Sequence, residues 1–213
     1  MPLRSIATFF VMLLFAGMAH AASTILVWGD SLSAGYGLKP GEDWPTLLQT
    51  RLQHKGFQHE VINGSVSGET SSGGRTRLPA ALERHRPDIL ILELGANDGL
   101  RGLRPQLIAD NLKAMITEAQ AAGARVLLVG MQMPPNYGAA YTRRFAQTFS
   151  DLAEDTGVAL VPFLLEGFAD QPELFLPDGI HPSAEAQPLV LDTVWNGLAP
   201  LLTQTQRAQA RKE

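Results

Sequence analysis

The segment TILVWGDSLS, residues 24–33, joins an apolar run to an abrupt polar turn. The run from Thr24 to Trp28 is typical of a buried strand. Gly29 and Asp30 are both common in turns, and Ser31 follows them directly. In open α/β folds, ligands bind at the carboxyl ends of the strands. The segment therefore predicts an α/β fold with a serine hydroxyl at its functional edge, although Gly-Asp-Ser alone also fits an ordinary turn.

Further apolar runs alternate with helical patterns along the chain. The clearest run, residues 88–94, is almost continuously apolar, as in a parallel strand covered on both faces. Its one acid, Glu93, should lie at the strand's edge or bond a neighbouring loop, and we assign it no catalytic role. We expect the other strands at residues 24–28, 57–62, 125–131 and 158–163, and helices beginning near residues 44, 72, 105, 141 and 183. The alternation predicts a three-layer α/β/α fold, with a flavodoxin-like five-stranded parallel sheet in the order 2-1-3-4-5.

The composition limits the class of protein. The 213 residues carry a formal net charge of −4 and include no cysteine. A mildly acidic chain argues against a nucleic-acid-binding protein, which usually shows a basic face. Without cysteine there are no disulfides, no thiolate metal ligands and no cysteine nucleophile. The length suits one domain with a substantial core.

The N-terminus has the pattern of a secretory signal peptide. Arg4 precedes an apolar run over residues 6–18, and Ala19-His20-Ala21 supplies small residues at the cleavage site. We expect cleavage after Ala21, a single domain over residues 22–202 and a polar tail over residues 203–213. The mature protein would be periplasmic or secreted, with no stable membrane anchor. The alternative is an uncleaved anchor, but the apolar run is shorter than the roughly 20 residues that a membrane span needs.

Distinctive residues follow the ends of the predicted strands. Ser31 follows the first strand, Gly68 the second and Asn97 the third, while Asp178 and His181 come after the fifth. The carboxyl ends of parallel strands share one edge of a sheet, so we expect these residues to converge. Each of them alone also fits an ordinary turn or surface loop.

Together these residues could carry out nucleophilic catalysis. Neutral His181 can accept the hydroxyl proton of Ser31 and later return it to a leaving group. Asp178, three residues before it, can bind the other ring nitrogen and stabilise the imidazolium. The backbone N–H groups of Ser31 and Gly68 and the side-chain amide of Asn97 are candidate donors for an oxyanion hole.

The chain resembles the SGNH (GDSL) hydrolase family in four short blocks that occur in the same order. The blocks are residues 29–33, Gly68 in its Ser/Gly-rich loop, residues 95–98 and residues 178–182. Residues 97–102 and 135–138 are similar to the periplasmic bacterial members of that family. The resemblance covers essentially the whole mature chain, with Ala96 at a position where glycine is frequent.

The resemblance implies roles that agree with the chemistry above. Ser31 would be the nucleophile, His181 the base and Asp178 the group that orients the base. Gly68 and Asn97 would be oxyanion donors together with the Ser31 N–H. The resemblance also implies hydrolysis of acyl thioesters, aryl esters and lysophospholipids, with no metal and no cofactor.

Substrate selection should come from two loops. Residues 100–103 and 133–141 are apolar enough to line an acyl groove, and Gly99 and Gly102 could let the first of them move as a flap. We expect Leu100 and Tyr137 to contact the acyl chain of a small-molecule ester or thioester. An ordinary connection between strand and helix is the alternative. We expect the protein to be a monomer.

Three other functions were weighed against this one. A metallophosphoesterase would need a cluster of His and Asp ligands, whereas only His181 lies in a suitable block. A flavodoxin-like module could bind an acyl ligand or FMN without turnover, but no phosphate-cradling glycine loop leads into a helix after the first strand. Another SGNH esterase, such as a carbohydrate acetylesterase, is the nearest enzymatic alternative.

Overall fold

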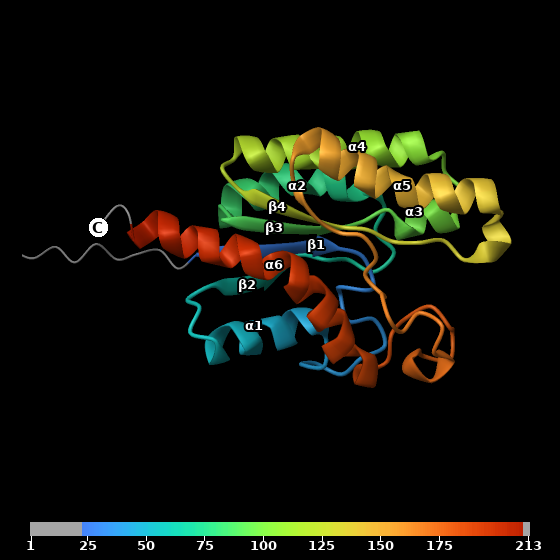
Figure 1. Ribbon diagram of the computed structural model, residues 1–213, viewed down its shortest axis with the longest axis horizontal. Coiled ribbons are helices and arrows are strands. Elements are labelled where there is room, and N and C mark those ends of the chain that lie inside the picture. The colour runs from blue at the N-terminus through green and yellow to red at the C-terminus, as the bar shows by residue number, and fades with distance from the viewer. Residues whose placement is uncertain (1–22, 211–213) are drawn as a thin grey trace, which may run out of the picture.

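A parallel sheet forms the middle layer of the molecule (Figure 1). The computed structural model describes residues 23–210, so the expected signal peptide, residues 1–21, lies outside the described residues. The strands are β1 (Thr24–Gly29), β2 (Glu60–Asn63), β3 (Ile89–Glu93), β4 (Arg125–Val129) and β5 (Ala159–Val161). They pair in parallel in the order β2-β1-β3-β4-β5. The predicted sheet and its strand order are confirmed.

Helices cover both faces of the sheet. They are α1 (Trp44–His54), α2 (Ser71–His85), α3 (Ala96–Leu100), α4 (Pro105–Ala121), α5 (Ala139–Thr156) and α6 (Gln187–Ala210). Figure 1 shows α2, α4 and α5 on one face and α1 and α6 on the other, which confirms the three layers. Within the described residues, none of these helices combines the length and the apolar character that crossing a membrane requires.

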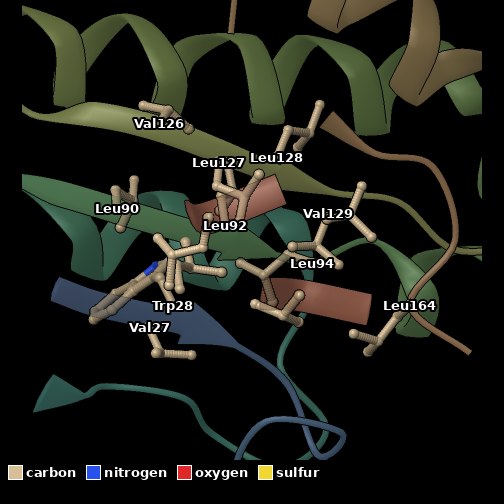
Figure 2. Close-up of a cluster of buried hydrophobic side chains, with 14 of the residues drawn as sticks. Val27, Trp28, Leu90, Leu92, Leu94, Val126, Leu127, Leu128, Val129 and Leu164 are labelled. Atoms are coloured by element: carbon tan, nitrogen blue, oxygen red, sulfur yellow. The ribbon is translucent and has the colours of Figure 1, made fainter. Parts of the chain in front are cut away.

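The core lies between the sheet and these helices. Every residue of β1 and β3 is buried, because helices cover both faces of the central strands. Figure 2 shows side chains of β1, β3 and β4 packed together, among them Val27, Leu90, Leu92 and Leu128. A rigid central sheet of this kind can hold the loops at its carboxyl edge in fixed positions.

The helix boundaries follow local chemistry that the sequence partly displays. Asp43 caps α1 by accepting a hydrogen bond from Thr46 N at 3.0 Å, as its place before Trp44-Pro45 indicates. Pro79 lies inside α2, and the helix continues past it to His85.

Two helices differ from their predicted extents. α3 occupies residues expected to form only a turn, and five residues are too few to show a helical period. A 3₁₀ turn at Ala184–Ala186 precedes α6, which begins at Gln187 rather than at Ser183. The backbone of α6 continues to Ala210, within the expected polar tail of residues 203–213.

Candidate active site

The carboxyl edge of the sheet brings the first and the last catalytic candidates together. Ser31, directly after β1, places its Oγ 2.8 Å from His181 Nε2. On the other side of the imidazole, His181 Nδ1 lies 2.8 Å from Asp178 Oδ2. Hydroxyl, imidazole and carboxylate thus form a continuous hydrogen-bonded chain, which is the geometry that proton transfer from serine to histidine needs.

The turn that carries Ser31 is built over a buried acid. Pairing of β1 with β3 sets Gly29 opposite Glu93. A Cβ on Gly29 would lie 2.6 Å from Glu93 Oε2 and 2.7 Å from Ser33 Oγ, so the position has no room for a side chain. Glu93 Oε2 accepts hydrogen bonds from Asp30 N at 3.2 Å and Ser33 Oγ at 2.8 Å. The acid of β3 therefore bonds a neighbouring loop, which was one of its two expected settings.

Asp30 and Glu93 are two carboxyl groups buried at this turn. Asp30 is 1% exposed, and its burial raises the pKa of its carboxyl to about 6. Burial also raises the pKa of Glu93 well above its usual value, and the nearby charge of Asp30 adds to the effect. The Ser31 turn therefore holds a pair of acids that resist full ionisation.

Asp178 has the opposite electrostatic setting. Its Oδ1 accepts hydrogen bonds from the backbone N–H groups of Ile180 at 2.9 Å and His181 at 3.0 Å. These bonds, first among them the one from His181, lower the pKa of Asp178 to about 2. An ionised Asp178 favours the imidazole tautomer with its proton on Nδ1, which leaves Nε2 as the acceptor facing Ser31.

Buried backbone contacts fix the segment that carries His181. Leu176 N donates to the His181 carbonyl at 2.7 Å. The buried side chain of Gln187, at the start of α6, accepts from Trp44 N at 3.0 Å and donates to the Pro182 carbonyl at 3.2 Å. Gln187 thus ties the histidine segment to α1. Sequence reasoning missed Gln187, because one glutamine at a helix start has no distinguishing pattern.

Two backbone N–H groups are open, one at Ser31 itself and one at Gly68 in the loop after β2. Gly68 is exposed, has a φ of +78° and would have nothing within 4 Å of an added Cβ. Within residues 23–210, neither the Ser31 N–H nor the Gly68 N–H has a hydrogen-bond acceptor. Open backbone donors of this kind can stabilise a developing negative charge.

Asn97 joins the loops that carry these two donors. Its side-chain Nδ2 donates to Asp30 Oδ2 at 3.0 Å and to the Glu69 carbonyl at 3.0 Å. Both amide hydrogens are therefore engaged in the free protein. The amide lies beside the Ser31 and Gly68 loops, but it must share or release one bond to reach a substrate oxygen.

A second contact that sequence reasoning missed holds Asn97 in place. The buried carboxylate of Asp98 accepts hydrogen bonds from Ser71 N at 2.8 Å and Ser71 Oγ at 2.7 Å. These bonds join α3 to the start of α2. An aspartate within a turn is too common for its spacing to reveal a partner so distant in sequence.

The two predicted substrate loops lie against each other. Tyr137 Oη donates to the Leu100 carbonyl at 2.9 Å, and Tyr141 Oη donates to the Leu103 carbonyl at 2.7 Å. Tyr137 and Leu100 are both half-buried at the edge of the core. The structure brings the two residues together, while their contact with an acyl chain stays a prediction.

A metal site would need several His, Asp or Glu side chains close together. Across residues 23–210, no group of three or more His, Asp or Glu side chains is placed to hold a metal ion.

Comparisons with known proteins find relatives over most of the chain. A family model described as the GDSL-like Lipase/Acylhydrolase family matches residues 27–188. The chain is 48% identical to "Esterase TesA" of Pseudomonas aeruginosa over 85% of this chain and 90% of the relative. It is 41% identical to "Thioesterase 1/protease 1/lysophospholipase L1" of Escherichia coli strain K12, over 91% of this chain and 92% of the relative. The solved structure titled "Crystal Structure of TesA" superposes with a TM-score of 0.82 at 47% identity, over 84% of this chain and 99% of that one.

The buried Asp30 carboxyl should make the free energy of unfolding depend on pH. Its folded pKa of about 6 lies above the ordinary value of 3.8, so between these values the folded state binds more protons than the unfolded state. Stability due to this group is therefore lost as pH rises through that window. Relative to Asp30→Asn, the wild type should lose on the order of 1–3 kcal/mol of unfolding free energy between pH 4 and pH 7.

Denaturant unfolding of both proteins at a series of pH values measures this difference. Groups far from Asp30 titrate alike in the two proteins and cancel, whereas Glu93, whose pKa the charge of Asp30 raises, titrates together with Asp30 as a pair. Asp170→Asn, at an exposed position, serves as the matched control and should show no such trend. A difference between Asp30→Asn and the wild type that stays constant with pH would show that burial does not perturb this carboxyl.

Proposed function

The chain belongs to the GDSL-like lipase/acylhydrolase family and is an esterase, and we propose that it works through an acyl-enzyme on Ser31. The observation that carries the proposal is the hydrogen-bonded chain from Ser31 Oγ through His181 to Asp178, with 2.8 Å at each contact of the imidazole. This arrangement would serve no purpose in a module that only binds an acyl ligand.

The proposed reaction has two halves. Ser31 Oγ attacks the carbonyl carbon of the ester while His181 Nε2 takes the hydroxyl proton. The tetrahedral intermediate collapses, and His181 returns the proton to the departing alcohol or thiol, which leaves the acyl group on Ser31. Water, activated by the same imidazole, then releases the acid. Asp178 stays ionised throughout, because its pKa is about 2, and it stabilises the imidazolium in both halves.

The negative charge that develops on the carbonyl oxygen needs hydrogen-bond donors around it. We assign this role to the open N–H groups of Ser31 and Gly68 and to the Asn97 amide. As charge develops, one Asn97 hydrogen would turn from Asp30 or Glu69 toward the oxyanion. A stronger bond in the transition state than in the ground state raises turnover rather than affinity.

The proposed substrates are small-molecule acyl esters and thioesters, including aryl esters and lysophospholipids. Relatives named for esterase, thioesterase and lysophospholipase activity support this range. We also propose that residues 1–21 direct export and are cleaved after Ala21, so that a monomeric enzyme acts in the periplasm or outside the cell.

Loss of the nucleophile tests the proposal directly. Wild-type enzyme mixed with a p-nitrophenyl acyl ester should release a burst of chromophore, followed by steady turnover. Ser31→Ala should abolish the burst and lower kcat at least about 10⁴-fold. Ser150→Ala, at an exposed serine of α5, is the matched control and should behave as wild type. A burst that survives in Ser31→Ala would place the acyl group elsewhere.

The oxyanion role of Asn97 has its own kinetic signature. Asn97→Ala should lower kcat by about 10²–10³-fold with little change in KM. Steady-state kinetics on an aryl ester supply both constants. A rise in KM alone would instead identify Asn97 as a residue that positions the substrate.

The two substrate loops should set the preferred acyl length. Leu100→Ser and Tyr137→Ser should lower kcat/KM by about fourfold for each acyl methylene that loses its contact, so long chains suffer most. Tyr137→Phe is the control that removes only the bond to the Leu100 carbonyl. Values of kcat/KM for a series of esters of increasing acyl length show whether either residue contacts the acyl chain. An unchanged profile for either serine variant would remove that residue from the acyl site.

A further inference from the structure

Tyr36 is an exposed aromatic residue beside the catalytic imidazole. Its side chain is 51% exposed, the largest exposed fraction among the large apolar residues of the described chain. Its ring centroid nevertheless lies 4.4 Å from that of His181, with the two planes 38° apart. One part of the ring therefore meets the imidazole, and the rest faces solvent.

The backbone holds this ring where it is. Gly35 and Gly37 flank Tyr36 with φ values of +72° and +75°, which glycine adopts without steric penalty. A Cβ on Gly37 would lie 2.5 Å from Leu176 Cδ1, so the loop presses against the segment that leads to His181. Tyr36 N also donates to the Ser31 carbonyl at 3.3 Å. The exposed ring is thus tied both to the nucleophile and to the base.

The proposed reaction indicates which part of the substrate lies near Tyr36. In the tetrahedral intermediate, the carbon bonded to Ser31 Oγ carries an oxyanion, an acyl chain and a leaving group. The oxyanion faces the open N–H groups of Ser31 and Gly68. The leaving atom must face His181 Nε2, because this nitrogen returns the proton to it. Whatever is attached to the leaving atom then extends past the imidazole, and Tyr36 is an exposed aromatic side chain in contact with that imidazole.

We propose that Tyr36 forms the leaving-group subsite and favours esters of flat, aromatic alcohols. The proposal rests on the proposed function, since it needs Ser31 and His181 in their catalytic roles. The exposed part of the Tyr36 ring offers an apolar face on which an aromatic leaving group can stack. Aromatic pairs of this kind gain free energy beyond simple burial of area. An aliphatic leaving group would gain much less from the same surface.

A second possible role for the Tyr36 ring is to position the catalytic imidazole, without any contact with the leaving group. His181 acts in both halves of the reaction, so loss of a positioning residue would slow acylation and deacylation together. A leaving-group subsite acts only in acylation, because the acyl-enzyme no longer carries the leaving group. The two roles therefore predict different kinetic steps.

The experiment compares two esters that share one acyl group. One has a substituted phenol as leaving group, and the other has a fluorinated aliphatic alcohol of matched acidity. For each variant, kcat/KM reports acylation, and the decay of the pre-formed acyl-enzyme reports deacylation. Tyr36→Ala should lower kcat/KM for the aryl ester by about threefold to tenfold. It should lower kcat/KM for the aliphatic ester much less and leave the deacylation rate unchanged, and Tyr36→Trp should restore the aryl preference.

The controls separate the possible failures. Leu107→Ala removes an exposed apolar side chain at the start of α4 and should match wild type with both esters. An equal loss for both esters, or slower deacylation, would overturn the subsite and make Tyr36 a positioning residue. Unchanged kinetics in Tyr36→Ala would also overturn it. If Ser31→Ala keeps the wild-type turnover of both esters, the proposed function itself fails.

Discussion

The hydrogen bond between Ser31 Oγ and His181 Nε2 is the contact on which the site depends. It joins residues 150 positions apart across 2.8 Å. A geometry this tight needs both loops to be fixed, and each is fixed by its own buried contacts. Glu93 holds the turn after β1, and Gln187 holds the segment before α6 against α1. The parallel sheet supplies the shared edge on which the two loops meet.

The environment of the turn suggests a trade between stability and catalysis. Two buried carboxyl groups with raised pKa values destabilise a fold, and hydrophobic replacements would serve packing better. Both acids shape the active edge: Glu93 anchors the serine turn, and Asp30 holds the Asn97 amide through a 3.0 Å bond. Asp178, which should carry a permanent charge, lies instead in a turn where backbone N–H groups stabilise that charge.

Much of this arrangement could be predicted from the sequence. Continuous apolar runs such as β3 indicated a covered parallel sheet, and turn residues at the strand ends indicated one functional edge. Blocks around Ser31, Gly68, Asn97 and His181 then pointed to a hydrolase of known type. Local patterns sufficed here because strands, turns and short motifs are encoded by neighbouring residues.

The supporting contacts could not be predicted in the same way. Asp98 meets Ser71 and Gln187 meets Trp44 only because packing of separate elements brings them together. Nothing in the spacing of these residues distinguishes them from polar residues on a surface. The engagement of both Asn97 hydrogens, and the contact of Tyr36 with His181, likewise depend on loop conformation. Such contacts decide how well a site is held, while motifs decide what chemistry it can perform.

Covalent labelling followed by peptide mapping tests the central assignment most directly. A fluorophosphonate ester phosphonylates a serine that an adjacent imidazole activates. We expect one adduct, on Ser31, and strongly slowed labelling in His181→Ala. Ser33 lies in the same tryptic peptide as Ser31. Its buried Oγ donates a hydrogen bond to Glu93, so fragment ions should show Ser33 unmodified. An adduct on Ser33 or on any other residue would show that Ser31 is not the nucleophile. Undiminished labelling in His181→Ala would show that His181 does not activate it.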